Sequence, residues 1–352
     1  MKLLVITQKY DINDSNLGAF VGWWDKLAER METVYVLTLE KRSEPTRSNI
    51  EVISMGKENG AIFLGKFFRF YFGLFKTIWK TDAILAHMIP KYVILAAPVA
   101  LIFRKPIYLW YTGHVLHWKL RLAVIFCKKV FTAHETAMRV NTPKRIVTGH
   151  GIDINKFQIP NTKYQISDKI TILSVGRITP SKGHDLIIKA IADLVKDGYN
   201  IELKVVGDVI QKHHKKYASF LKKLAFDSGV GNHVEFTVVP YGKVPEYFTN
   251  AEILINAVPF FGGLDKVVLE AMSSGIVPLT SNNAFLSVFP KDIAPQLVFK
   301  EYDLENLKNK LKNILDKKLY LDESLVNQLR DIVVRNHNLD NLINRIIKEI
   351  EK

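Results

Sequence analysis

Two loops in the second half of the sequence carry residue types that could bind and neutralise a diphosphate. The first loop, residues 174–183, contains Arg177 and Lys182, and the second, residues 262–275, opens with glycines and contains Glu270. Arginine and lysine pair with phosphate oxygens, and the free backbone N–H groups at a helix start attract the same anion. A carboxylate such as Glu270 suits the hydroxyl pair of a ribose. Together the two loops predict a site for a nucleotide diphosphate.

Each loop lies between a predicted strand and a predicted helix. Residues 170–175 and 253–258 are short apolar runs typical of buried strands, and helical patterns follow both loops. The carboxyl ends of parallel strands meet at one edge of a sheet, where open α/β folds bind ligands. We therefore expect both loops to converge on one crevice.

Strand-like runs alternate with helical patterns along the chain, which indicates parallel α/β architecture. Seven strands are predicted in the first half, at residues 3–7, 33–39, 50–54, 83–86, 107–111, 129–132 and 145–148. The second half contains five more and a weaker run, at residues 170–175, 201–206, 233–237, 252–257, 277–280 and 297–299. Residues 303–352 have a helical pattern.

The length of 352 residues exceeds one ordinary core and favours two doubly wound domains that face a central cleft. We place an N-terminal, acceptor-side domain at 1–157, a linker at 158–169 and a C-terminal, nucleotide-binding domain at 170–335. Residues 336–352 form a C-terminal helix that could pack back on the N-terminal domain.

Composition narrows the class of protein. The single cysteine, Cys127, excludes an internal disulfide and a cysteine-based metal cluster, and it fits a reducing cytosol. No apolar run reaches the roughly 20 residues needed to cross a bilayer. The net charge of +14 calls for an anionic partner or aids solubility. We expect no nucleic-acid partner, because no nucleic-acid-binding motif accompanies the charge.

With both loops placed, the chain resembles the family 4 glycosyltransferases, which have the GT-B fold. Four motifs in the correct order, spread over almost the whole chain, carry the resemblance. They are the glycine loop LGAF at 17–20, the turn VTGHGIDINKF at 147–157, the donor loop SVGRITPSKG at 174–183 and the helix LEAMSSG at 269–275.

The resemblance implies an enzyme that moves a hexose, with retained anomeric configuration, from a nucleotide-diphosphate sugar to an acceptor. The donor is a UDP- or GDP-sugar, and no metal ion or other cofactor is required. The acceptor is a glycan or a lipid-linked molecule in the synthesis of cell-envelope polysaccharide or glycolipid. Such an enzyme acts in the cytoplasm, free or peripheral at the inner face of the cell membrane.

The same resemblance gives roles to individual residues. Arg177 and Lys182 neutralise the leaving diphosphate, where the alternatives are a surface ion pair and a solvated lysine. His114, just after the predicted strand at 107–111, corresponds to a histidine near the transferring carbon. Gly18 lets the backbone approach the donor or acceptor, or is a plain turn glycine. Glu270 accepts hydrogen bonds from the ribose hydroxyls, or simply favours a predicted helix start. The backbone N–H groups of Gly263, Leu264, Asp265, Lys266 and Val267 cradle the diphosphate.

One position departs from the family pattern. Family members carry a first glutamate eight residues before the second, where it contacts the donor sugar, and here that position is Gly262. The following pair is Leu264 and Asp265 in place of Phe-Gly. Asp265 is a candidate to replace the missing sugar contact. The alternative function is a catalytically impaired GT-B protein that serves as a nucleotide-binding or scaffold subunit.

Residues 61–80 combine dense aromatic side chains with basic ones and contain no acidic residue. Lys66, Arg69, Lys76 and Lys80 lie among them. A basic, aromatic amphipathic helix suits the surface of an anionic membrane. The alternative is a core helix whose aromatic face packs on the sheet, and both interpretations stay open at this stage.

Overall fold

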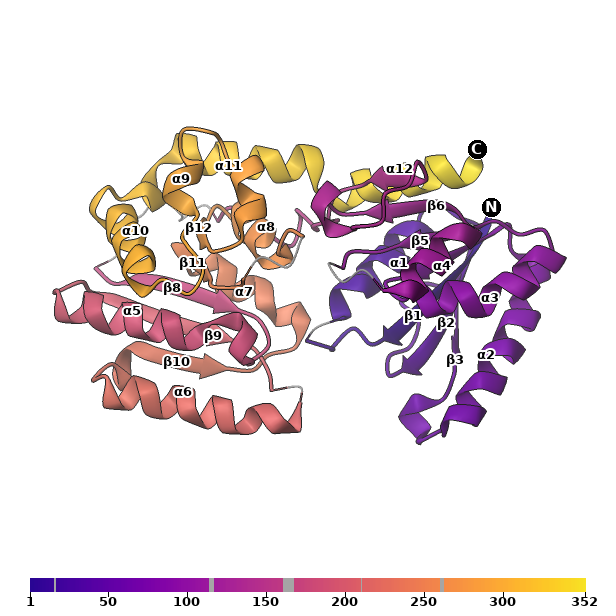
Figure 1. The fold of residues 1–352 in the computed structure, drawn as a ribbon, viewed down its shortest axis with the longest axis horizontal. Coiled ribbons are helices and arrows are strands. Elements are labelled where there is room, and N and C mark those ends of the chain that lie inside the picture. The colour runs from indigo at the N-terminus through magenta and orange to yellow at the C-terminus, as the bar shows by residue number, and fades with distance from the viewer. Residues whose placement is uncertain (16, 114–116, 161–167, 210, 260–262) are drawn as a thin grey trace. The chain divides into compact units, whose positions relative to one another are not determined.

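In the computed structural model the chain forms two compact units, which are described separately (Figure 1). The first comprises Met1–Gly151 and Leu339–Lys352, and the second comprises Ile152–Asn338. The structure describes residues 1–15, 17–113, 117–160, 168–209, 211–259 and 263–352. Ile152 and Phe157, which the sequence assigns to the end of the first domain, are buried in the core of the second unit. The backbone N–H of Ile152 donates a 2.6 Å hydrogen bond to the carbonyl of His337 there.

The first unit contains a seven-stranded parallel sheet with the strand order β3-β2-β1-β4-β5-β6-β7. Leu3 on β1 is aligned with Val34 on β2 and with Ala83 on β4, and all three are buried. Strands covered on both faces are apolar throughout, as these are. The strands are β1 Lys2–Tyr10, β2 Thr33–Lys41, β3 Ile50–Ser54, β4 Ala83–His87, β5 Ile107–Trp110, β6 Cys127–Thr132 and β7 Arg145–Val147.

Helices cover both faces of this sheet. Leu4 and Ile6 of β1 share one core with α2 (Phe63–Thr77), α3 (Pro90–Ile102) and α4 (Trp118–Phe126). Leu3 and Val5 point to the opposite face and share a second core with α1 (Val21–Ala28) and α12 (Leu339–Glu351). The period-2 alternation along β1 therefore separates two helical layers, and α12 completes one of them.

The second unit contains a five-stranded parallel sheet with the order β10-β9-β8-β11-β12 and one continuous core. Its strands are β8 Ile170–Val175, β9 Ile201–Val206, β10 Val234–Thr237, β11 Ile253–Asn256 and β12 Val277–Thr280. Its helices are α5 His184–Lys196, α6 Lys215–Asp227, α7 Val244–Thr249, α8 Lys266–Ser273, α9 Ala294–Leu297, α10 Leu304–Asp316 and α11 Glu323–Asn336.

These two sheets confirm the predicted pair of doubly wound α/β domains and all twelve of the main strand predictions. The weaker run at 297–299 was wrong as a strand, because α9 occupies its start and Val298 forms just an isolated bridge to Thr280. The helical pattern of 303–352 corresponds to α10, α11 and α12. Among the described residues, every helix is too short or too polar to span a membrane.

Candidate active site

The loop after β8 is shaped by a glycine at its close approach to β11. It passes through a short 3-10 helix, η5 (Pro180–Lys182), and enters α5 after Gly183. Gly183 has φ +62°, and a Cβ there would lie 2.6 Å from the carbonyl oxygen of Ala257. Another residue would suffer both the left-handed backbone and this clash. The glycine therefore lets the loop lie directly against the end of β11.

The two predicted loops meet through Lys182 and Asp265. The Lys182 Nζ lies 3.9 Å from Asp265 Oδ1, and about a fifth of each side chain is exposed. Burial raises the pKa of Asp265, an effect that Lys182 and a hydrogen bond from Asn282 oppose. Lys182 thus lies next to the start of α8, where its positive charge could pair with a bound anion.

Arg177 is exposed on the first loop, two residues after the end of β8. Within the described part of the chain, no carboxylate lies close enough to form an ion pair with it, so its charge is not balanced locally. This does not fit the surface ion pair considered from the sequence. A guanidinium in this state can bind an incoming phosphate oxygen in bidentate fashion.

Glu270 is almost completely buried and is held by two side chains. Its Oε1 accepts a 3.1 Å hydrogen bond from the Tyr241 hydroxyl and forms a 3.1 Å ion pair with Lys266 Nζ. Lys266 also donates to the Tyr241 oxygen at 3.0 Å. Burial and the adjacent Glu270 raise the pKa of Tyr241 well above its usual value, so this hydroxyl stays a donor.

The start of α8 differs from the sequence-based interpretation of Glu270. Because α8 begins at Lys266, Glu270 is its fifth residue and lies beyond the first turn. The field of a helix end decays within that turn, so it does not explain why a carboxylate is placed here. The N–H groups of Lys266 and Val267 at the helix start have no intrahelical acceptor and remain suited to an anion.

Asn282, which the sequence analysis missed, ties down the loop before α8. Its Nδ2 donates to the carbonyl of Gly263 at 2.7 Å and to Asp265 Oδ2 at 2.9 Å. Its Oδ1 accepts from the N–H of Ala284, which fixes the orientation of the amide. Asn282 and Tyr241 lie shortly after the ends of β12 and β10, so polar residues that closely follow a strand were the available signal.

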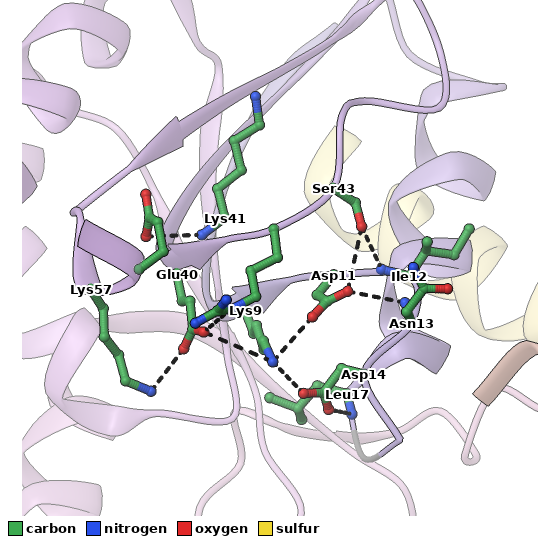
Figure 2. Close-up of polar contacts among 12 residues, drawn as sticks. Lys9, Asp11, Ile12, Asn13, Asp14, Leu17, Glu40, Lys41, Ser43 and Lys57 are labelled. Carbon is green, nitrogen blue, oxygen red and sulfur yellow. Dashed lines mark hydrogen bonds and ion pairs between the residues drawn. The ribbon is translucent and has the colours of Figure 1, made fainter. Parts of the chain in front are cut away.

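In the first unit, Gly18 is buried in a turn that Lys9 and Asp14 organise. The Gly18 N–H donates to the carbonyl of Asp14, and Asp14 Oδ1 accepts from the N–H of Leu17. Figure 2 shows Lys9 pointing toward Asp14, Asp11 and Glu40, with Nζ–oxygen distances of 2.5, 3.1 and 3.9 Å. The turn therefore has its own rigid support. His114 and Gly262 lie outside the described residues.

The second unit matches a known protein family. Residues 156–331 match the family model for glycosyl transferases group 1. Protein CapJ of Staphylococcus aureus is 30% identical over 185 residues, which cover 52% of this chain and 44% of CapJ. A GDP-mannose-dependent alpha-(1-6)-phosphatidylinositol monomannoside mannosyltransferase of Mycobacterium tuberculosis is 26% identical over 147 residues, 38% of this chain and 37% of that enzyme. The chain thus matches less than half the length of these relatives.

Solved structures extend the likeness to both units. HepE of Anabaena, in a crystal structure with UDP and glucose, has a TM-score of 0.80 at 16% identity and full coverage of both chains. WaaG, a glycosyltransferase involved in lipopolysaccharide biosynthesis, has a TM-score of 0.68 at 18% identity and 99% coverage of each chain. At these identities the likeness establishes the GT-B fold.

Proposed function

Because the chain belongs to the group 1 glycosyl transferases, we propose that it is a retaining, metal-independent hexosyltransferase that uses a UDP- or GDP-sugar. The acceptor is a glycan or lipid-linked molecule in cell-envelope polysaccharide or glycolipid synthesis. The observation that carries the proposal is the convergence of Lys182, Asp265 and the start of α8. Arg177, on the same loop as Lys182, has no ion-pair partner among the residues that the structure describes.

In the proposed reaction, the diphosphate of the donor takes the place of Asp265 as the partner of Lys182. Arg177 and the N–H groups from Gly263 to Val267 bind the remaining phosphate oxygens. As the bond to the sugar breaks, negative charge grows on the diphosphate, and these fixed groups stabilise it without reorganisation. Glu270, already oriented by Tyr241 and Lys266, accepts hydrogen bonds from the ribose hydroxyls.

Gly18 and His114 have proposed roles on the acceptor side. The supported turn at Gly18 lets the backbone approach the donor or acceptor, and His114 hydrogen-bonds the donor sugar near the transferring carbon. Asp265 remains the candidate for the sugar contact that Gly262 cannot make. Its carboxylate is held by Asn282, so it would act from a fixed position.

We also propose that the enzyme binds the anionic inner face of the cell membrane through residues 61–80. One face of α2 is that of a core helix, because Phe70 and Leu74 are buried in the core. On the opposite face, Phe68, Phe72 and Phe75 of α2 and Trp79 of the short 3-10 helix that follows, η3 (Ile78–Lys80), form an exposed stripe with exposed fractions of 69%, 71%, 51% and 71%. Such a stripe is suited to insertion among lipid head groups.

The first experiment measures thermal stabilisation by UDP, GDP, ADP and their sugars. A ligand at about 100 times its Kd adds about 2.7 kcal/mol of stability. We expect UDP or GDP to stabilise the wild type and Glu270→Ala to lose much of that effect, whereas Glu246→Ala, an exposed carboxylate on α7, should not. Absence of stabilisation by any nucleotide would overturn the donor site.

Two further measurements address the finer claims. Nuclear magnetic resonance of the product gives its anomeric configuration, and inversion would refute the retaining assignment. Activity should survive treatment with EDTA, and a loss of activity that Mg²⁺ restores would refute metal independence.

A separate measurement tests the membrane proposal. Phe68→Ser with Phe72→Ser should abolish sedimentation with anionic vesicles, and unchanged sedimentation would contradict the role of the exposed stripe.

A further inference from the structure

A pocket of about 380 Å³ lies at the carboxyl edge of the sheet in the first unit. Its floor includes Gln8 near the end of β1, Leu39 near the end of β2 and Ile89 just after β4. The N-terminal halves of α2 and α3 supply most of the remaining lining residues. Open α/β sheets bind ligands at this edge, and the volume is that of a small-molecule site.

The side chains that line the pocket are mainly apolar or aromatic, apart from two lysines and Gln8. Phe63, Phe67 and Phe70 line it from α2, and Tyr92 and Leu95 line it from α3. Lys66 and Lys91 stand among them, with Lys91 Nζ 5.2 Å from the centre of the Phe63 ring. The pocket therefore offers apolar contact together with positive charge.

These two charges are not balanced by the protein. Over the residues that the structure describes, neither Lys66 nor Lys91 has a carboxylate within ion-pair distance, whereas Lys9, Lys26 and Lys76 of the same unit do. Two unpaired cations beside an apolar cavity complement an amphiphile whose head group is an anion.

We propose that this pocket binds the acceptor, and that the acceptor is an amphiphile in which an apolar chain carries a phosphate. The chain occupies the pocket and the phosphate contacts Lys66 and Lys91. This inference rests on the proposed transferase function and names its acceptor class. Position favours an acceptor over a bulk membrane lipid, because the pocket and the turn at Gly18 both lie at the carboxyl edge of the same sheet.

The pocket is distinct from the exposed stripe of α2. Phe63, Lys66, Phe67 and Phe70 line the pocket, whereas the stripe consists of Phe68, Phe72, Phe75 and Trp79. Residues at spacings of three and four share a helix face, so the two sets mark nearly opposite faces. Binding of a single amphiphile and binding of a membrane can therefore be changed one at a time.

The test is calorimetric titration of the full chain with dodecyl phosphate below its critical micelle concentration. We expect saturable binding of one molecule per chain, about tenfold or more tighter than dodecyl maltoside, which lacks the anion, and inorganic phosphate, which lacks the tail. Lys66→Gln with Lys91→Gln should weaken binding about tenfold, and the charge-matched pair Lys76→Gln with Lys80→Gln should change it less than about threefold. Equal losses in both pairs, or no preference for the phosphate, would overturn the proposal.

Two controls separate the hypotheses. Phe68→Ser with Phe72→Ser should abolish vesicle binding and leave the titration unchanged, and loss of both would show that the pocket is no separate site. UDP and GDP should stabilise the Lys66→Gln, Lys91→Gln variant as they do the wild type. If nucleotides bind and dodecyl phosphate does not, the acceptor inference fails alone. If dodecyl phosphate binds and no nucleotide does, the transferase proposal fails and removes the acceptor assignment.

Discussion

Lys9 and Lys182 occupy similar places in the two units but differ in what surrounds their charge. Each lies at the carboxyl end of the first strand of its sheet or in the loop that follows, and their side chains are 18% and 20% exposed. Lys9 Nζ has carboxylates at 2.5 and 3.1 Å, whereas Lys182 Nζ has one at 3.9 Å.

The difference separates a structural cation from one available to a ligand. Burial alone would lower the pKa of Lys9, but hydrogen bonds and ion pairs with Asp14, Asp11 and Glu40 raise it overall. The charge of Lys9 is therefore neutralised by carboxylates of the same unit, and the lysine holds the turn at Gly18. Lys182 and its neighbour Arg177 keep most of their attraction for an incoming anion.

The largest effect should come from the available cations. Lys182→Ala or Arg177→Ala should each remove roughly 2–4 kcal/mol of transition-state stabilisation, because charge on the leaving diphosphate loses its partner. This loss lowers kcat/KM by about 30- to 1,000-fold. Melting temperatures should change little. Steady-state kinetics measures the fall in kcat/KM, and thermal melts measure the melting temperature. An unchanged kcat/KM in both variants would remove the contrast with Lys9.

Lys9→Met should show the opposite pattern. Removing the lysine leaves Asp11, Asp14 and Glu40 close together without their common partner, and we expect a loss of about 2 kcal/mol in the free energy of unfolding. Urea denaturation measures this loss. Lys57→Met, which removes a more exposed partner of Glu40, is the control and should cost less. A stable Lys9→Met variant would show that its network is not structural.

Tyr241→Phe tests a case between the two lysines. Lys266 is paired with Glu270, as Lys9 is paired with its carboxylates, but Glu270 itself is proposed to bind the donor. Loss of one hydrogen bond to a buried carboxylate should cost about 1 kcal/mol in donor binding, or roughly a fivefold increase in the donor KM, at unchanged kcat. Tyr247→Phe, on α7, serves as the matched control. A fall in kcat alone would place Tyr241 in the chemical step instead.

The smallest effect concerns Asp265, whose pKa is raised by burial. The folded state then holds its proton to higher pH than the unfolded state does, so this group stabilises less as pH rises from the unfolded pKa through the folded one. Asp265→Asn should remove that dependence, and its melting temperature relative to wild type should increase with pH. A constant difference between pH 4.5 and 7.5 would contradict the assignment.

The sequence was sufficient for the sheets and for the two loops of the second unit. Apolar runs bounded by turn residues predicted all twelve strands, whereas the order of the strands within each sheet came from the structure. Boundaries were less certain where elements join directly. β6 begins at Cys127, immediately after α4 ends at Phe126, and no turn residue marks that junction.

Contacts between distant residues were beyond the sequence. Tyr241 and Glu270 are 29 residues apart, and Asn282 and Gly263 are 19 apart, so neither pair belongs to a local motif. The same holds for Lys9 and Glu40, whose pairing depends on the register of β1 and β2. The sequence motifs predicted the residues that are proposed to contact the donor, but they did not predict residues such as Tyr241 and Asn282 that hold those residues in position.

The return of α12 to the first unit has a consequence for synthesis on the ribosome. Leu342, Ile343 and Ile346 lie in a core with Trp24 and Leu27, more than 300 residues earlier in the chain. The second unit, in contrast, is built from one continuous segment. The first unit therefore cannot complete its core until α12 has been synthesised, and a nascent chain that stops before residue 339 leaves Trp24 and Leu27 of α1 without their partners from α12.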